Sequence, residues 1–277
     1  MDLYKQTCQS ISKLVTQRYS TSFTLGIRTL AGKFHAPIYA IYGFVRFADE
    51  IVDTFHDYDR EKLFYKFCAD TSEALEDGIS LNPVLHSFQG VVKEHNISRE
   101  YIDAFLKSME MDLQNRQYEP ETYNEYIYGS AEVVGLMCLQ VFCEGDELLF
   151  NSLKKAARSL GAAFQKVNFL RDMKSDYQER GRVYFPTVDF NCFTCDCKKK
   201  IETDIEKDFD DAFEGILRLP KSSQLGVYLA YVYYKKLFYK IKQLPAASIK
   251  QERVRVPDNE KMALLVSSYV RCQFNVL

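Results

Sequence analysis

Apolar positions recur every three to four residues along most of this chain, which is the period of an amphipathic α-helix. No stretch alternates apolar and polar residues as a half-buried strand would. The pattern predicts helices over Leu3–Tyr19, Pro37 to about Phe55, Arg60–Asp77, Asn82–Glu94, Arg99–Gln117, Thr122–Phe142, Asp146–Gln178, Lys200–Leu217, Ser222–Lys242 and from about Asn259 onward. The breaks between them are short turn signals such as Asn82-Pro83, with no long linker. We therefore expect a single all-α domain over residues 1–277.

Two of these predicted helices carry a polar stripe beside their apolar face. The first stripe consists of Tyr42, Arg46, Asp49 and Asp53, and the second of Gln165, Asn168, Asp172 and Asp176, with Arg171 at its edge. Aspartates four residues apart on a helix point the same way and repel one another, so each pair favours a cation that compensates it. Either pair alone would also fit a solvated helix face, but two matching stripes indicate a site.

Carboxylate oxygens on rigid helices suit Mg²⁺, which usually binds one or two carboxylates together with substrate phosphates. Mn²⁺ is the alternative ion. The two stripes therefore predict a metal-assisted enzyme that acts on a diphosphate.

Composition narrows the class of protein. With 47% hydrophobic residues among 277, the chain can bury a large core, and its net charge of −2 without a basic block gives no sign of a nucleic-acid partner. Met1 to Ser10 lacks the apolar stretch of a signal peptide, and no uninterrupted apolar run approaches the ~20 residues that span a bilayer. We expect a cytoplasmic protein.

Other metal chemistries fit the sequence less well. The eight cysteines are scattered without a disulfide pattern, and Cys192, Cys195 and Cys197 lack a second Cys pair or a His to complete a zinc site. We expect those three to lie in an incidental loop. A di-iron bundle would need Glu ligands and two Glu-x-x-His motifs, and the nearest approach, Asp53-Thr54-Phe55-His56, occurs once.

Five blocks in order resemble the squalene and phytoene synthase family. They are Tyr19-Ser20-Thr21-Ser22-Phe23; Tyr42-x-x-x-Arg46-x-x-Asp49-x-x-x-Asp53; Tyr126-x-Tyr128-x-x-Ala131-x-x-Val134-Gly135; Gln165-x-x-Asn168-x-x-Arg171-Asp172-x-x-x-Asp176; and Arg180-Gly181-Arg182-x-Tyr184-x-Pro186. The resemblance implies the all-helical isoprenoid synthase fold with a central cavity. It also implies a prenyltransferase of isoprenoid and carotenoid biosynthesis that condenses two prenyl diphosphates head to head through a cyclopropyl intermediate.

The resemblance assigns roles to the residues that match. By resemblance, Asp49, Asp53, Asp172 and Asp176 bind the metal with Asn168, and Gln165 and Asn168 orient the cluster and the intermediate. Arg46, Arg171 and Arg253 would contact the diphosphate, Tyr42 and Tyr126 would lie near the reacting carbons, and Ser20, Ser22 and Phe23 would line the substrate entrance. Arg180 and Arg182 lie one turn and a loop beyond Asp176, so they are either further diphosphate contacts or surface charges. Guanidinium groups suit diphosphate because their planar fork of donors matches its oxygens. Many members have Gly where this chain has Glu132, and we expect Glu132 to point away from the cavity.

The identity of the substrate rests on a closer resemblance. Tyr128-Gly129-Ser130-Ala131 and the residues after it are similar to bacterial phytoene synthases, which join two geranylgeranyl diphosphates without NADPH. The alternatives are squalene or dehydrosqualene synthesis from farnesyl diphosphate, and a non-catalytic relative that serves as a scaffold. Chain-elongating enzymes of the same fold would carry Asp-Asp-x-x-Asp, which Asp49-Glu50-Ile51-Val52-Asp53 lacks. Expected partners are downstream isoprenoid-pathway enzymes and, for delivery of an insoluble product, the inner face of a membrane.

Overall fold

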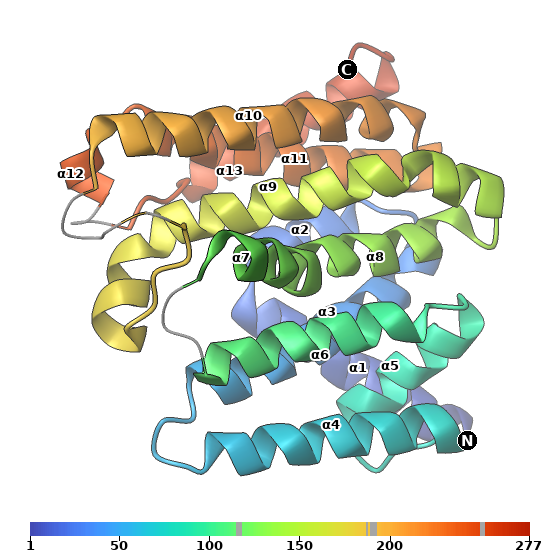
Figure 1. Ribbon diagram of the computed structural model, residues 1–277. Helices are drawn as coiled ribbons and strands as arrows, with labels where there is room; N and C mark the ends of the chain where they lie inside the picture. Colours follow the sequence, from blue (N-terminus) through green and yellow to red (C-terminus); the bar gives the residue numbers. More distant parts are fainter. Residues whose placement is uncertain (115–117, 187, 189–192, 250–252) are drawn as a thin grey trace.

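The computed structural model describes residues 1–114, 118–186, 188, 193–249 and 253–277, and the regular elements in this part of the chain are helices (Figure 1). The α-helices are α1 (Asp2–Tyr19), α2 (Thr21–Arg28), α3 (His35–Asp53), α4 (Arg60–Asp77), α5 (Pro83–Glu94), α6 (Arg99–Gln114), α7 (Pro120–Ile127), α8 (Val133–Cys143), α9 (Glu147–Arg180), α10 (Cys195–Arg218), α11 (Lys221–Lys242), α12 (Ala246–Ile249) and α13 (Asp258–Gln273). Two shorter turns, η1 (Gly32–Phe34) and η2 (Tyr128–Glu132), complete the set. The predicted all-α class is confirmed.

Helix α2 was not predicted, because the pattern ended the first helix at Tyr19 and marked the next one only from Pro37. Ser20 has an extended backbone (φ −148°, ψ 106°) between α1 and α2. Its side chain accepts the Phe23 N–H at 3.2 Å, which caps the new helix. Ser20 thus turns the chain so that α2 leaves α1 in a new direction and brings Ser22 and Phe23 to the cavity.

The helix predicted over Thr122–Phe142 is three elements. Between α7 and α8 lies η2, one π-helical turn, a feature found mostly at functional sites. Glycines let its neighbours approach: a side chain on Gly129 would meet the Ala104 carbonyl oxygen at 2.4 Å, and one on Gly161 would meet the Ala131 carbonyl oxygen at 2.5 Å. The turn is therefore held closely between α6 and α9.

The beginning of α10 also differs from the prediction, which started that helix at Lys200. Thr194 caps α10 by accepting the Cys197 N–H at 3.2 Å, so the helix begins at Cys195. Cys195 and Cys197 therefore lie in its first turn and not in a loop, whereas Cys192 is outside the described residues.

A small hydrophobic cluster of Leu139, Cys143 and Leu153 adds to two large ones that make up most of the interior. One gathers side chains of α3, α4, α5, α6 and α8, and the other gathers those of α7, α9, α10 and α11. Helix α9 runs the width of the molecule and packs along α10 on one side and α8 on the other (Figure 1). A cavity of about 410 Å³ lies between the clusters, because Ile38 and Ile41 of the first and Ile216 and Tyr234 of the second line it.

One stretch is long and apolar enough to cross a membrane by length and composition. It covers Pro120–Cys143, which is α7, η2 and α8, and 56% of its apolar window is buried inside the protein. Val133, Leu136 and Met137 within it have no exposed surface. A core helix passes the same test, and this stretch contributes both core and cavity wall.

Candidate active site

The first aspartate pair lies on the last two turns of α3. Arg46 donates from Nη1 to Asp49 Oδ2 at 2.5 Å and from Nη2 to Glu50, and its Nε has no partner among the described residues. Tyr42, Arg46 and Asp49 line the cavity, with the Asp49 side chain 33% exposed into it. Burial, and next the charge of Asp53, raise the pKa of the Asp49 carboxyl to about 7.

The second pair lies on the last three turns of α9. Arg171 contacts Asp172 through Nε at 3.0 Å and Nη2 at 2.5 Å, and Arg253 approaches the same carboxylate through Nε at 2.7 Å. Burial raises the pKa of Asp176 to about 7, opposed by Arg180. Burial also lowers the pKa of Arg171, but Asp172 more than offsets this, so Arg171 stays charged.

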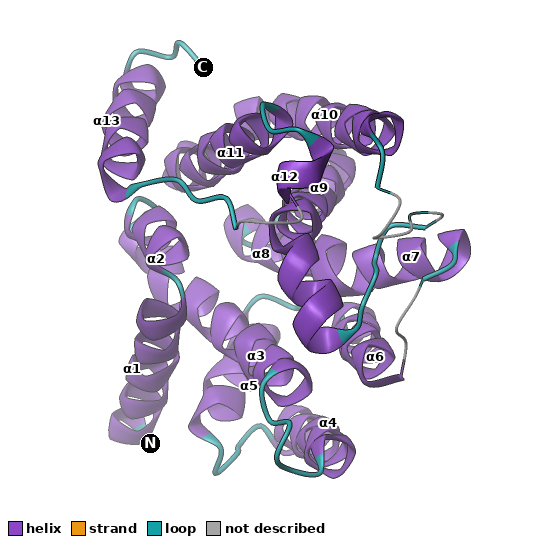
Figure 2. Ribbon diagram, turned by 90° about the vertical axis from the view of Figure 1, so that its left-hand side faces the viewer, coloured by secondary structure: helices purple, strands orange, loops and turns teal. Residues whose placement is uncertain are grey.

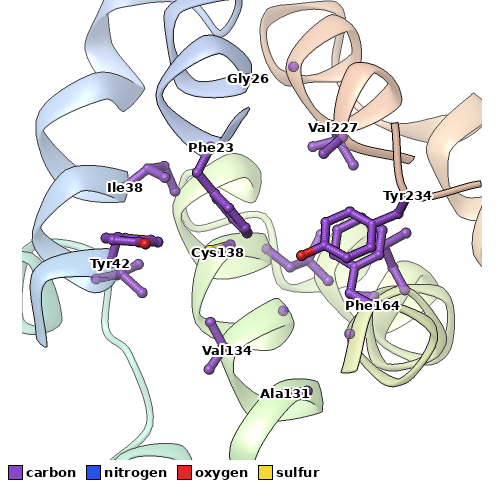
Figure 3. A pocket seen from close by; sticks show the side chains of 18 of the residues that line it. Phe23, Gly26, Ile38, Tyr42, Ala131, Val134, Cys138, Phe164, Val227 and Tyr234 are labelled. Atoms are coloured by element: carbon purple, nitrogen blue, oxygen red, sulfur yellow. The ribbon is translucent and has the colours of Figure 1, made fainter. Parts of the chain in front are cut away.

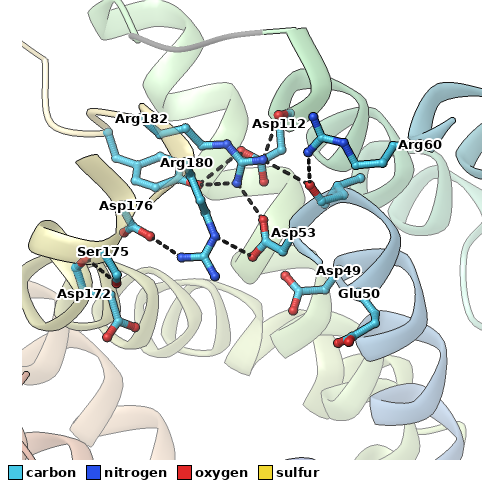
Figure 4. A network of polar contacts seen from close by, with 12 residues as sticks. Asp49, Glu50, Asp53, Arg60, Asp112, Asp172, Ser175, Asp176, Arg180 and Arg182 are labelled. Carbon is cyan, nitrogen blue, oxygen red and sulfur yellow. Dashed lines mark hydrogen bonds and ion pairs between the residues drawn. The ribbon is translucent and has the colours of Figure 1, made fainter. Parts of the chain in front are cut away.

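The two pairs face one another, as Figure 4 shows. The guanidinium of Arg180 lies between them, 2.8 Å from Asp176 Oδ1 through Nη1 and 3.5 Å from Asp53 Oδ2 through Nε. A guanidinium group is only a few ångströms across. Because Arg180 contacts both Asp53 and Asp176, these two carboxylates share one site although they are 123 positions apart in the chain. The ends of the two polar stripes therefore meet at Arg180.

Gly181 creates the return of the chain toward this site. It ends α9 with a left-handed backbone (φ +67°), a conformation that glycine adopts without strain. The following residue, Arg182, is then directed back over the end of α3. Its Nη1 donates to Asp53 Oδ1 at 2.7 Å, and its Nη2 donates to the Asp112 carbonyl oxygen at 2.8 Å.

A fifth aspartate of this site, Asp112 on α6, was missed by the sequence analysis. Its carboxylate accepts hydrogen bonds from three tyrosine hydroxyls, namely Tyr118 at 3.0 Å, Tyr126 at 2.7 Å and Tyr184 at 3.2 Å, and it lies 3.5 Å from Arg182 Nη1. Asp112 is 6% exposed and Arg182 4%. The only sequence clue is an aspartate on the apolar side of a helix, between Met109, Met111 and Leu113.

This network changes the interpretation of Arg182. We expected it to contact substrate diphosphate or to be a surface charge, but its guanidinium is buried and is occupied by Asp53, Asp112 and backbone carbonyls. The structure therefore favours a role in positioning Asp53. Arg180, with 27% of its side chain exposed, is closer to the opening between the acid pairs.

The remaining predicted residues line the cavity or its rim. Ser22, Phe23, Tyr42, Tyr126, Gln165 and Asn168 are all part of its wall, and Figure 3 shows Phe23 and Tyr42 among the lining side chains. The Tyr234 hydroxyl donates to Asn168 Oδ1 at 3.3 Å, and the Tyr234 ring stacks on Phe164 with centroids 3.9 Å apart. Two residues singled out in the sequence lie outside the wall. Ser20 is a helix cap and not part of the wall. Glu132 accepts from Arg158 Nε at 2.5 Å outside the cavity, as expected.

The donor set fits Mg²⁺. Among the described residues no three His, Cys, Asp or Glu side chains converge closely enough to hold a metal by themselves. Mg²⁺ does not need that many, because it takes one or two carboxylates and completes its shell with water and phosphate oxygens. The raised pKa values of Asp49 and Asp176 indicate carboxylates whose negative charge is under-compensated, which a cation would relieve.

Comparisons with known proteins identify the family of this chain. The family described as squalene/phytoene synthase matches residues 16–260. Phytoene synthase 1 of Solanum lycopersicum is 25% identical over 93% of this chain and 66% of its own length, and the Narcissus pseudonarcissus phytoene synthase is 29% identical over 82% and 58%. This chain thus spans less than two thirds of either plant enzyme.

The fold has a close counterpart among solved structures. The crystal structure of a dehydrosqualene synthase in complex with a ligand covers 97% of this chain and 98% of its own, with a TM-score of 0.83 and 20% identity. At that identity the likeness shows the isoprenoid synthase fold. Together with the family match, it establishes that the chain belongs to the squalene/phytoene synthase family, prenyltransferases that join prenyl diphosphates head to head.

Proposed function

We propose that this protein joins two geranylgeranyl diphosphates to form phytoene. The observation that carries the proposal is a deep apolar cavity with opposed acid pairs at one end. Its lining runs along α9 from Asn168 at the polar end to Leu153. At a rise of about 1.5 Å per residue, that stretch of helix is roughly 22 Å long.

That depth favours the longer substrate. An extended carbon chain advances roughly 1.2 Å per bond, as a polypeptide backbone does, so a geranylgeranyl chain spans about 18 Å and a farnesyl chain about 13 Å. Fifteen-carbon tails would leave the residues beyond Ala157, such as Leu153 and Phe142, without contact. Empty apolar space is costly because its lining loses dispersion contacts, and a geranylgeranyl tail would fill it.

At the polar end, the chain's own residues would bind and discharge the diphosphate. Mg²⁺ held by Asp49, Asp53, Asp172 and Asp176, with Asn168, would neutralise the charge on the departing diphosphate. Arg46 lines the cavity, and Arg171 follows the lining residue Asn168 by three positions on α9 and stays charged. The unpartnered Nε of Arg46 offers a further donor.

The cavity would then protect the allylic cation. Its wall is apolar apart from the rim, and the rings of Phe23, Tyr42, Phe164 and Tyr234 face into it (Figure 3). Aromatic faces stabilise a cation, and exclusion of water prevents its capture. Burial raises the pKa of Tyr42 to about 12, so its hydroxyl stays protonated at neutral pH.

The overall reaction needs no reductant. In the first half, one diphosphate leaves and C1 of that substrate bonds to C2 of the other through the electrons of its C2–C3 double bond. Loss of a proton from C1 then supplies the electron pair for a second bond, from C1 to C3, which closes the cyclopropyl ring. In the second half, the other diphosphate leaves, the cyclopropyl carbinyl cation rearranges, and loss of a second proton gives phytoene. Squalene formation would end instead in hydride capture from NADPH.

The direct test is to supply purified protein with Mg²⁺ and either geranylgeranyl or farnesyl diphosphate, with and without NADPH, and to identify the hydrocarbon by mass. We expect a C40 hydrocarbon from geranylgeranyl diphosphate without NADPH. A product obtained only from farnesyl diphosphate would refute the phytoene assignment in favour of squalene or dehydrosqualene. Absence of any product from folded protein would favour the non-catalytic relative.

A further inference from the structure

Helix α13 presents its apolar side chains to solvent. Met262, Val266, Tyr269 and Val270 are 53%, 60%, 55% and 46% exposed. At about 100° per residue they cover one continuous face of the helix. The opposite face, which packs on α11, carries Leu264, Leu265, Ser268 and Cys272.

This is the reverse of an ordinary surface helix, whose polar residues face water. Ser268 is 1% exposed and its hydroxyl has no partner among the described residues. An exposed apolar strip of this kind marks an interaction site when it is continuous.

The neighbouring helices add positive charge. Helices α13, α2 and α1 follow one another along one edge of the molecule (Figure 2), and we call their exposed side chains the docking face. The cations of these three helices are Lys5, Lys13, Arg18, Arg28, Lys261 and Arg271, against the acids Asp2, Asp258 and Glu260. The three helices therefore carry +3, whereas the whole chain carries −2 and the remainder −5.

The two acids of α13 are already neutralised. Asp258 contacts Lys261 Nζ at 2.9 Å, and Glu260 contacts Lys240 Nζ at 2.6 Å. Lys13, Arg18 and Arg28 are exposed and make no ion pair within the described part of the chain. An apolar strip bordered by such cations is complementary to an anionic lipid surface.

The docking face also borders the cavity. Lys261 and Leu264 of α13 and Ser22, Phe23 and Leu25 of α2 line it, and Phe23 is 38% exposed. The helices that form the face thus also form part of the cavity wall.

We propose that the docking face seats the protein on an anionic bilayer, with the outer side chains of α13 entering the headgroup region. The choice of a lipid occupant rests on the proposed function, whose substrate tails and product are hydrocarbons. A symmetric pair of chains is disfavoured because an isologous contact would bring one +3 face against another. Tyr19 and Tyr269, 48% and 55% exposed, have the amphipathic rings that favour such an interface.

Flotation with vesicles tests this without turnover. Full-length protein is mixed with phosphatidylcholine vesicles or with vesicles that also contain phosphatidylglycerol, at salt concentrations of about 0.1 M and about 1 M. We expect flotation with the anionic vesicles that weakens at high salt. Substitution of Lys13, Arg18 and Arg28 by Gln should weaken binding about 100-fold at low salt.

The apolar strip is tested by the double variant Val266→Glu/Val270→Glu, for which we expect at least a roughly 100-fold loss of vesicle binding. The matched control is Leu148→Glu/Leu217→Glu, which places the same charges on apolar side chains 86% and 42% exposed on α9 and α10. Circular dichroism checks that both variants fold.

Three results would overturn the proposal: no flotation of the wild-type protein with anionic vesicles, equal flotation of the two double variants, or light scattering that shows a dimer lost only in Val266→Glu/Val270→Glu. Turnover with detergent-dispersed substrate is measured separately. Unchanged turnover in the Val266→Glu/Val270→Glu variant is expected, and failure of the wild type to turn over any substrate would count against the proposed function alone.

Discussion

The polar and apolar ends of the cavity are built differently. At the polar end each acid has a specific partner, such as Arg46 for Asp49 and Arg171 for Asp172. At the apolar end the described lining residues include no such pairs, and small residues such as Ala157 and Gly215 leave room between bulky ones. We infer that the polar end determines whether the reaction occurs, and that the apolar end determines which substrate is accepted.

Replacement of a metal-binding acid should have the largest effect. Asp49→Asn or Asp172→Asn keeps the size of the side chain but removes an anionic ligand, and we expect turnover to fall about 1,000-fold, which is about 4 kcal/mol of transition-state stabilisation. Helix content by circular dichroism should not change. The control is Asp210→Asn, an exposed acid on α10, which should keep full activity. Full activity in both Asp49→Asn and Asp172→Asn would refute the metal assignment.

The buried network behind the acids should govern stability. Arg182→Gln leaves Asp112 and Asp53 without their shared cation, and loss of one partner of a buried pair costs about 3–5 kcal/mol. Urea unfolding measures this change. The matched control is Arg158→Gln, whose side chain is 48% exposed beside Glu132, and its expected cost is about 0–1 kcal/mol. Equal costs in the two variants would show that the Asp112 network adds nothing to stability.

The apolar end should set the substrate length. Ala157 lies eleven residues along α9 from Asn168, or about 16 Å, which is beyond the reach of a farnesyl tail and within that of a geranylgeranyl tail. Ala157→Phe should therefore lower kcat/KM for geranylgeranyl diphosphate roughly 10–100-fold relative to farnesyl diphosphate. This factor corresponds to about 1–3 kcal/mol, the usual free energy of a lost or blocked apolar contact. Ala157→Val is the control for packing. An unchanged ratio in Ala157→Phe would place the tail elsewhere.

The smallest effect should be a pH dependence confined to the polar end. The pKa values of Asp49 and Asp176 are raised to about 7, so each becomes protonated, and a poorer metal ligand, as pH falls through that value. At limiting Mg²⁺ the rate should therefore rise with pH and reach half its maximum near pH 7. Saturating Mg²⁺ should move that midpoint to lower pH, because metal binding competes with the proton. A midpoint independent of Mg²⁺ would contradict this explanation.

Sequence spacing was sufficient for most of the helices and for the paired acids because both depend on the local period of the α-helix. Asp49 and Asp53 share a face of their helix whatever surrounds them, and the same holds for Asp172 and Asp176. Each pair could therefore be predicted from its own helix, without knowing how far apart the two helices lie in the chain. The family resemblance then matched the two halves, and the contacts of Arg180 agree with that match.

Features that depend on distant partners could not be predicted in this way. Asp112 obtains its role from Arg182 and Tyr184, about 70 residues further along the chain, which no helical period relates to it. The π-helical turn at Tyr128–Glu132 depends on close packing against α6 and α9. The start of α2 after Ser20 and the early start of α10 after Thr194 did have local signals, since both residues are good helix caps, but the helical period alone does not mark them.

The most direct test of the account is whether the two acid pairs act as one site. Asp49 and Asp172 contact different arginines, so only a shared ligand should couple them. Calorimetry with Mg²⁺ and a non-reactive geranylgeranyl thiodiphosphate would give the affinities of Asp49→Asn, Asp172→Asn and the double variant. A single site predicts a double variant little weaker than either single one, with a coupling free energy above about 1 kcal/mol. Losses that add to within about 0.5 kcal/mol would contradict it.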